Sequence, residues 1–398
     1  MTALVFVFWF SAACIVYAYA GYPIVLILLS SFKQFRSDWR HVSGSGSRRV
    51  VASQGELPRV AVLVAAFNEE RHIGERVRNL LEQTYPAERL RIYIGSDASD
   101  DRTAEIVRSF DSERLTFADF TARRGKASVI NDLAALATED ILVLTDANTF
   151  FKPDAVDKLV RHFERPEVGC VCGELRLVTD GATGDNQDHI YWRYERMLKF
   201  FESRIGALLG ANGGVYALRR EGFVAIPANT IVDDFWISMQ VIETGQQCVY
   251  DPEAVATETI PERIGDEFRR RVRIGMGNYQ ALKRFAGLLG PRHGAVAFTF
   301  LSHKCLRWFV PHFMVLAFVS NLLLARQGGY ALLLLGQVLF YAAAWFGWRA
   351  SRQGDTPRWL RLPLFFVSMN LGLLVGFWRF ATSGTSGVFW FVSRAWSA

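Results

Sequence analysis

Charged residues are distributed unevenly along the chain. None occurs in residues 1–32, residues 33–290 have the mixed composition of a soluble domain, and the remaining sequence is again mainly apolar. A transmembrane helix needs about 20 apolar residues, because a helix rises about 1.5 Å per residue and the bilayer core is about 30 Å thick. The pattern therefore predicts an anchor, a soluble domain and a membrane bundle, in that order.

Four segments are apolar and of spanning or near-spanning length: residues 1–32, 308–325, 327–348 and 362–378. The first could instead be a secretory signal cleaved after Ala18-Tyr19-Ala20, but no basic region precedes it and the apolar run continues past that point. We predict an N-terminal transmembrane helix in residues 1–32, three transmembrane helices within residues 291–380, and an interfacial tail in residues 381–398.

Basic residues flank these segments asymmetrically. Lysines and arginines follow the first span and separate the third from the fourth, whereas only Arg326 lies between the second and the third. Cytoplasmic flanks of membrane proteins are enriched in these residues. We therefore expect a basic linker in residues 33–57 and a soluble domain, both in the cytosol, in a multi-pass protein of the cell membrane (inner or plasma membrane).

Strand and helix patterns alternate in the soluble region. Strands are predicted at residues 59–67, 90–95, 115–117 and 141–145, and helices at residues 68–83, 102–110, 126–137 and after Pro153. This alternation is typical of an α/β, Rossmann-like domain with a mostly parallel sheet. No G-x-G-x-x-G follows the first strand and no P-loop motif occurs, so dinucleotide and P-loop sites are only weakly indicated.

Polar side chains follow three of these strands. They are Asn68 and Glu69, then Asp97, Asp100 and Asp101, then Asp146 and Asn148. Binding residues of such sheets gather at the carboxyl ends of the strands. Asp146 and Asn148 alternate, so both oxygens could face one Mg²⁺ or Mn²⁺ ion that bridges a diphosphate. The alternative is a turn in which they cap the following helix.

Paired carboxylates, Asp233 and Asp234, stand before an apolar helix. Adjacent carboxylates repel, which favours protonation of one and tunes its affinity for a hydroxyl proton. Asp234 is therefore the candidate general base. In the alternative interpretation, Asp233 is a helix N-cap and Asp234 only a favourable charge in the first turn.

Basic residues form a cluster at Arg269, Arg270, Arg271 and Arg273. Guanidinium groups could bind a leaving diphosphate, or the segment could be an amphipathic helix on anionic lipid. Arg124-Gly125-Lys126, before a predicted helix, could hold an anion or be a solvated turn. The net charge of +6 is concentrated around the membrane flanks and residues 263–273 rather than over a broad face, so no nucleic acid partner is predicted.

Taken in order, these segments resemble the membrane-integrated family 2 glycosyltransferases, which have a GT-A fold and include cellulose, chitin, hyaluronan and poly-N-acetylglucosamine synthases. Ala65–Glu69 looks like the family's first nucleotide-contacting motif, and Ser96–Asp100 is similar to its D-D-G-S-x-D loop. Lys126 with Asn131 resembles G-K-x-x-x-x-N, Asp146 and Asn148 resemble D-x-D, and Asp233-Asp234 resembles the pair whose second acid is the catalytic base.

The resemblance implies a GT-A domain in residues 58–258 and interfacial amphipathic helices in residues 259–290. It implies nucleotide-sugar contacts at Ala66, Asn68, Glu69, Asp97, Lys126, Asp146, Arg270 and Arg273, metal contacts at Asp146 and Asn148, and an acceptor-side loop with Gly210, Asn212 and Gly213. A tight turn would explain the last segment nearly as well.

Two positions depart from the family pattern. The last acid of D-x-D is Asn148, a neutral ligand, and Ile274 replaces the tryptophan of Q/R-x-x-R-W after Arg270 and Arg273. In the family that tryptophan helps to hold an acceptor sugar, so its absence bears on processive chain extension.

The predicted function is therefore inverting transfer of a sugar from a nucleotide diphosphate donor, with UDP favoured by the resemblance, to a polysaccharide. The alternatives are a lipid acceptor, ceramide-like or polyprenyl-linked, and a non-catalytic membrane scaffold. A bundle of four spans leaves little room for a polysaccharide channel unless subunits associate, so a homo-oligomer is a further expectation.

Overall fold

The computed structural model describes residues 1–43, 56–178, 187–259, 264–354 and 356–395. The chain divides into two units. The membrane unit comprises Met1–Leu29, Thr183–Leu198 and Arg263–Thr382, and the sheet unit comprises Ser30–Ala182, Lys199–Glu262 and Ser383–Ala398. Each unit is described by itself.

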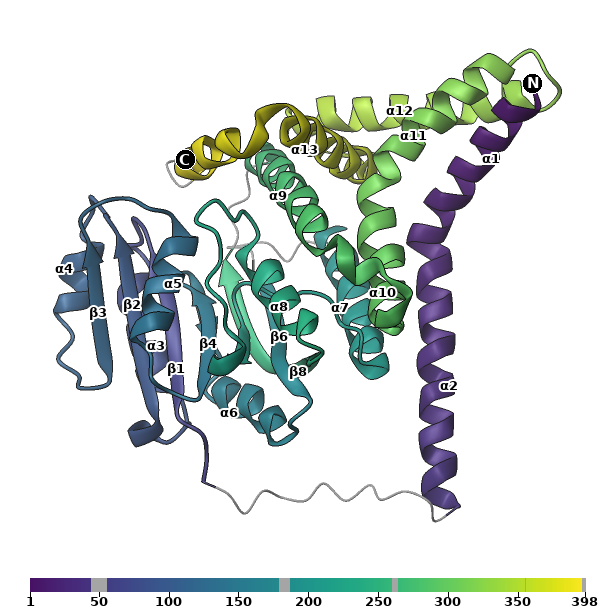
Figure 1. The fold of residues 1–398 in the computed structure, drawn as a ribbon. Helices are drawn as coiled ribbons and strands as arrows, with labels where there is room; N and C mark the ends of the chain where they lie inside the picture. The colour runs from purple at the N-terminus through teal and green to yellow at the C-terminus, as the bar shows by residue number, and fades with distance from the viewer. Residues whose placement is uncertain (44–55, 179–186, 260–263, 355, 396–398) are drawn as a thin grey trace. The chain divides into compact units, whose positions relative to one another are not determined.

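Within the described residues, one eight-stranded sheet forms the centre of the sheet unit (Figure 1), in the order β3-β2-β1-β4-β7-β6-β8-β5. Its strands are β1 (Val60–Ala66), β2 (Leu90–Asp97), β3 (Leu115–Phe120), β4 (Ile141–Asp146), β5 (Thr149–Phe151), β6 (Val168–Val178), β7 (Tyr216–Arg219) and β8 (Gln247–Thr259). Strands β3, β2, β1 and β4 are parallel, and β6 is parallel to β8. Strand β7 is antiparallel to β4 and β6, as β5 is to β8. The predicted mostly parallel α/β sheet is confirmed.

The four predicted strands occur as β1 to β4, while β5, β7 and β8 are not predicted by the sequence pattern. β1 is buried along its whole length, which gives the continuous apolar run of a central parallel strand covered on both faces. β8 carries exposed and half-buried polar residues between its buried ones, so its signal is weaker than that of β1.

The helices of the sheet unit are α3 (Ile73–Leu81), α4 (Thr103–Arg108), α5 (Lys126–Leu136), α6 (Ala155–Val160) and α8 (Asp233–Glu243). Helix α3 begins later than predicted because Asn68 has a φ of 55°, a left-handed conformation that interrupts any helix from residue 68. Helix α7 (Gln187–Ile205) begins in the membrane unit and ends in the sheet unit.

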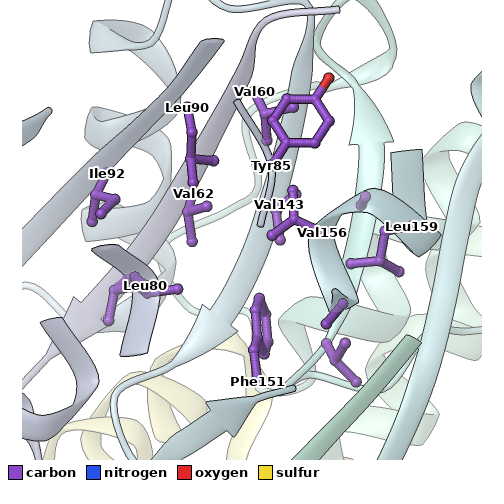
Figure 2. Close-up of a cluster of buried hydrophobic side chains, with 14 of the residues drawn as sticks. Val60, Val62, Leu80, Tyr85, Leu90, Ile92, Val143, Phe151, Val156 and Leu159 are labelled. Carbon is purple, nitrogen blue, oxygen red and sulfur yellow. The ribbon is translucent and has the colours of Figure 1, made fainter. Parts of the chain in front are cut away.

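The core of the sheet unit lies between β1, β2, β4 and the helices on one face of the sheet. Figure 2 shows Val62 of β1 and Val143 of β4 with Leu80 of α3 and Phe151 of β5, all buried in one apolar cluster. On the opposite face α5 packs on β1 and β2. Gly95 permits this approach, since a Cβ there would lie 2.5 Å from a methyl carbon of Val129. Packing in this core thus fixes the positions of β1, β2 and β4, the strands that are followed by the polar residues of the candidate site.

The membrane unit contains mainly long helices. They are α1 (Thr2–Val16), α2 (Tyr22–Val42), α9 (Ile264–Phe285), α10 (Ala295–Thr299), α11 (Leu306–Leu324), α12 (Tyr330–Ser351) and α13 (Arg358–Ala395), with π-helical turns at Tyr17–Gly21 and Phe300–Cys305. The unit contains α2 only as far as Leu29 and α13 only as far as Thr382. Four helical segments of the described chain are long and apolar enough to cross a membrane: Thr2–Val42, Ala295–Leu324, Tyr330–Ser351 and Arg358–Thr382.

These four segments agree with the four predicted spans, although their limits differ. The first helix continues through Val42, into the region predicted as a linker, and residues 44–55 of that linker lie outside the described residues. Helix α13 continues through Ala395, so most of the predicted tail is helical, and residues 396–398 lie outside the described residues. The interfacial position of α9 and of the tail stays a prediction.

Glycines bring α9 and α13 into backbone contact within the membrane unit. A Cβ on Gly376 would lie 2.8 Å from the carbonyl oxygen of Val272 and 2.9 Å from the Cα of Gly275. A Cβ on Gly372 would lie 2.9 Å from the Cβ of Arg271. Small residues four apart allow this kind of close helix crossing in membranes.

A buried ion pair joins α7 and α11 in the same unit. Arg307 donates to the carboxylate of Glu195, and His303 Nε2 lies 3.7 Å from the other oxygen of that carboxylate. Burial opposes ionisation of Glu195, but Arg307 and His303 together hold its pKa well below the usual range. Glu195 is therefore ionised, as a carboxylate. The neighbouring Tyr194 donates to the carbonyl oxygen of Tyr19, in the first π-helical turn, at 3.2 Å.

Candidate functional site

The candidate site is built from residues at the carboxyl ends of β1, β2 and β4, the loop before β7 and the first turn of α8. Its centre is Lys126, the first residue of α5. Lys126 Nζ lies 2.8 Å from Asp146 Oδ1 and 2.9 Å from Asp233 Oδ2. Burial opposes the charge on Lys126, but Asp146 and Asp233 outweigh it and raise the pKa of the ammonium. The structure thus joins three residues that the sequence predicts for one site.

Asp234 is the second residue of α8 and faces the loop before β7. Its Oδ1 accepts a hydrogen bond from the Phe235 backbone N–H at 2.7 Å, and a Cβ on Gly213 would lie 3.1 Å from its Oδ2. Burial first, and the charge of Asp233 next, raise the pKa of Asp234 to about 6, against the opposing effect of Lys126. A carboxylate with this pKa can accept a proton near neutral pH.

The alternative interpretations of the two acidic motifs are now partly resolved. The residue before α8 is Val232, so Asp233 is not the N-cap, although both acids do lie in the first turn, where the helix dipole favours them. The element after Asp146-Ala147-Asn148 is strand β5, so the interpretation that these residues cap a helix is wrong.

The loop Gly210–Gly214 lies against the first turn of α8. Gly210 has a φ of 84°, and a Cβ there would lie 2.6 Å from the Phe235 ring. Asn212 Nδ2 donates to the Gly173 carbonyl oxygen at 2.8 Å, and Lys199 donates to Asn212 Oδ1. Glycine is thus required at residue 210, where this loop approaches α8. Lys199 holds the loop through Asn212, although it belongs to no motif from which this contact could be predicted.

Asn148 and Asp146 lie on the short turn between β4 and β5. Asn148 Nδ2 lies 3.4 Å from Oε1 of Glu258, which stands opposite Thr149 in the β5–β8 pair. Burial, followed by the charge of Asp146 and lesser effects that include Glu258, raises the pKa of Glu69 to about 7. Several acidic side chains therefore lie close together at this turn. Glu258 belongs to no sequence motif, so its place beside Asn148 could not be predicted from the sequence.

These residues fit a cation that is held jointly with a nucleotide. Within the described residues, no three His, Cys, Asp or Glu side chains are gathered as a complete cation-binding group. Mg²⁺ is usually bound by one or two carboxylates together with substrate phosphates. Asp146 and the amide oxygen of Asn148 can supply the protein ligands of such a site, and the excess negative charge around Glu69 favours a cation.

The loops after β1 and β2 are held together by hydrogen bonds. Asp97 is buried, and its two oxygens accept the backbone N–H groups of Arg124 and Gly125, each at 2.7 Å. Asn68 Oδ1 accepts the backbone N–H of Asp100 at 3.1 Å. Asp97 therefore fixes the entry to α5 and so the position of Lys126. The predicted nucleotide contacts of Ala66, Asn68, Glu69 and Asp97 stay predictions.

Ala98 has a φ of 56°, in the left-handed region. It stands where the D-D-G-S-x-D pattern has glycine, the residue that adopts this conformation without steric cost. The backbone of this loop thus matches the motif although the side chain does not.

Arg270, Arg273 and Ile274 lie on α9, in the membrane unit. Their part in the site stays a prediction.

Comparison with known proteins agrees with this architecture. Residues 61–224 match the family model "Glycosyl transferase family 2". The chain is 26% identical over 251 residues to the poly-beta-1,6-N-acetyl-D-glucosamine synthase of Staphylococcus aureus (strain COL), which covers 62% of this chain and 60% of that protein. It is 25% identical over 241 residues to the synthase of the same name from Staphylococcus epidermidis, with 59% and 58% covered. The chain thus matches about 60% of the length of these relatives.

A solved structure resembles the chain over most of its length. The mannosyltransferase PcManGT from Pyrobaculum calidifontis, in complex with GDP-Man and Mn²⁺, matches 91% of this chain and 98% of its own with a TM-score of 0.65 and 22% identity. At this identity the likeness establishes the fold alone.

The sheet order and the likeness to this structure give the sheet unit a GT-A fold. Residues 61–224 thus resemble glycosyl transferase family 2, and the chain is similar to poly-beta-1,6-N-acetyl-D-glucosamine synthases.

Proposed function

We propose that the chain is an inverting glycosyltransferase that moves a sugar from a nucleotide diphosphate, in the first instance UDP, to a polysaccharide at the membrane. The observation that carries this proposal is the environment of Asp234. It is a carboxylate with a pKa of about 6 that lies against a glycine loop and next to the Lys126 bridge between Asp146 and Asp233.

In the proposed reaction, Asp234 accepts the proton of an acceptor hydroxyl. The hydroxyl oxygen forms a bond to the anomeric carbon while the bond from that carbon to the diphosphate oxygen breaks, and the nucleoside diphosphate leaves with the electron pair. Attack from the face opposite the leaving group inverts the anomeric carbon, so an α-linked donor gives a β-linked product. A base with a pKa near the working pH suits this proton transfer.

Residues of the chain also stabilise the leaving group. Mg²⁺ or Mn²⁺, held by Asp146 and Asn148 with the donor phosphates, would neutralise charge that develops on the diphosphate. Lys126 supplies a fixed positive charge at the same end of the sheet, and its bridge holds Asp146 and Asp233 together against their mutual repulsion. Arg270 and Arg273 are proposed to bind the diphosphate from α9.

The donor and the acceptor are proposed from the relatives. The two synthases that the chain matches are named for poly-N-acetylglucosamine, which supports a polysaccharide acceptor and makes UDP-N-acetylglucosamine the first donor to test. The structural neighbour binds GDP-Man with Mn²⁺, so guanosine donors belong in the same screen.

A lipid acceptor is the second candidate. The described chain has four candidate spans, which leave little room for a polysaccharide channel unless subunits associate. Ile274 also stands where the family pattern has an acceptor-holding tryptophan. Both observations favour transfer of one sugar to a membrane lipid.

The first experiment measures release of nucleoside diphosphate by purified protein over a panel of UDP and GDP sugars, with and without Mn²⁺. Asp234→Asn should abolish release and leave donor binding largely intact, because the amide cannot accept the proton. Asp157→Asn, on α6, is the matched control and should retain release. Release unaffected by Asp234→Asn would remove this residue from the mechanism, and donor binding without release by the unaltered protein would support the scaffold alternative.

A second experiment separates the acceptors. With the active donor labelled, high-mass carbohydrate on gel sizing supports a polysaccharide product, and a single-sugar product in the organic phase supports a lipid. Ile274→Trp belongs in this assay, because longer products would connect retention of the acceptor to that position.

A further inference from the structure

Arg76 is a fully buried arginine that the proposed reaction does not use. It lies on α3 with 0% of its surface exposed, and its guanidinium group lies over the Phe151 ring, 4.3 Å from the ring centroid. No carboxylate pairs with it among the described residues. A buried charge without such a partner is costly, so its hydrogen bonds are informative.

Those hydrogen bonds reach both sides of the turn that carries Asp146 and Asn148. Arg76 Nη2 donates to Thr145 Oγ1 at 2.7 Å, directly before the turn. Arg76 Nη1 donates to Asn79 Oδ1 at 2.7 Å, and Asn79 bonds both the N–H and the carbonyl oxygen of Phe151 at 2.8 Å, at the far end of β5, the strand that follows the turn. Figure 2 shows Phe151 of β5 in the same buried cluster as Leu80 of α3, the helix that carries Arg76 and Asn79.

Thr145 extends this network to the acceptor-side loop. Its hydroxyl accepts from Arg76 and donates to the carbonyl oxygen of Gly214 at 2.7 Å, and all three groups are buried. Gly214 follows Gly213, which lies against Asp234. One side chain on α3 therefore contacts, directly or through one hydroxyl, both the proposed metal turn and the loop beside the proposed base.

We propose that Arg76 is a positioning residue of the transfer site, which sets the Asp146–Asn148 turn and the Gly210–Gly214 loop in register with one another through Thr145 and Asn79. This inference rests on the proposed function. The rigid guanidinium fork makes two hydrogen bonds in fixed directions, and an ammonium group cannot reproduce both. Misplacement of reacting groups by about 1 Å can cost about a hundredfold in rate.

Paired substitutions separate position from charge. Thr145→Val keeps the shape and charge of the site but breaks both hydrogen bonds, whereas Thr145→Ser keeps the hydroxyl. Arg76→Lys keeps the charge and loses the fork, whereas Arg76→Met loses both. We expect kcat for nucleotide release to fall about ten- to hundredfold in Thr145→Val and Arg76→Met, less in Arg76→Lys, and little in Thr145→Ser.

The matched control is Arg219→Met. Like Arg76, Arg219 donates hydrogen bonds from its guanidinium group and lies over a phenylalanine ring, but its acceptors are backbone carbonyl oxygens and it stands at the far end of the β4–β7 pair. It should lower the melting temperature without changing kcat per folded molecule. If Thr145→Val and Arg76→Met behave like Arg219→Met, Arg76 is only a structural residue and the proposal is overturned.

A readout without turnover keeps this test independent of the proposed function. Mn²⁺ is titrated into each variant with UDP present, and binding is followed by loss of the free Mn²⁺ signal in electron paramagnetic resonance. Thr145→Val should bind Mn²⁺ about tenfold more weakly than Thr145→Ser, since only the hydroxyl differs and displaced ligands bind less well. Equal binding by the two would overturn the proposal. Absence of turnover in the unaltered protein, with the Mn²⁺ difference intact, would instead overturn the proposed reaction.

Discussion

At the scale of single residues, the sequence predicts the acids of the site better than their supports. Asp146, Asp233 and Lys126 are predicted by type and spacing, and the structure joins them. Glu258 and Arg76 escape prediction because they have no local motif and reach the site only through strand pairing or helix packing. Residues that carry the chemistry of a site can thus be predicted from local sequence motifs. Residues that position them depend on contacts between distant parts of the chain and cannot.

The pKa of Asp234 predicts an acid limb in the pH profile. The residue acts as a base only when ionised, so kcat/KM should fall tenfold for each pH unit below about 6. The charge of Asp233 raises this pKa, so Asp233→Asn should move the limb to lower pH. Initial rates of nucleotide release between pH 4.5 and 8 test both statements. A limb that stays in place in Asp233→Asn would contradict the assigned cause.

Ala98 predicts a stabilising substitution. Its left-handed φ of 56° costs an alanine about 1–2 kcal/mol, and glycine avoids this at a smaller entropic cost. Ala98→Gly should therefore raise the free energy of unfolding by about 0.5–1 kcal/mol. Ala135→Gly, the same change on the exposed face of α5, should lower it. Thermal unfolding of both variants measures the difference, and a destabilised Ala98→Gly would show that the loop is not strained at this residue.

At the scale of elements, burial decides what sequence patterns reveal. β1 and β4 are almost wholly buried and apolar, so their positions are predicted within one or two residues. The three-residue β5 and the long, partly exposed β8 have no comparable signal. The start of α3 is displaced because Asn68 bonds to the neighbouring loop rather than continuing a helix. Such preferences of single loops do not appear in hydrophobic periodicity.

The crossing of α9 and α13 makes a prediction at this scale. Gly376→Val would place a side chain within 2.8 Å of the Val272 carbonyl oxygen, so the helices must separate. The loss should be about 1–3 kcal/mol. Gly336→Val, on α12, meets no atom within 4 Å and should change stability little. Thermal unfolding in detergent compares the two, and equal melting temperatures would mean that the crossing tolerates separation.

At the scale of the whole molecule, hydropathy predicts the number of spans and family motifs predict the class of fold. The structure and the comparisons confirm four candidate spans and a GT-A domain. The sequence does not reveal which helices pack together in the membrane, because lipid-facing and protein-facing positions are both apolar. Orientation in the membrane is a matter for experiment.

The distribution of basic residues predicts that orientation. The loop before α12 should be outside and the loop before α13 inside. A membrane-impermeant maleimide applied to intact cells should label Gly329→Cys and leave Gln353→Cys unlabelled until the membrane is opened, with the unaltered chain as background. The reverse pattern would place the sheet unit outside the cell.

The ion pair between Glu195 and Arg307 bears on how the chain enters the membrane during synthesis. Arg307 is the second residue of α11, within the candidate span Ala295–Leu324, and an arginine in a spanning helix raises the free energy of insertion by at most about 2.5–3.5 kcal/mol, the value for the helix centre. Glu195 precedes Arg307 by 112 residues, so its carboxylate has left the ribosome before the arginine emerges. The order of the two segments along the chain therefore makes the carboxylate available before the arginine is synthesised.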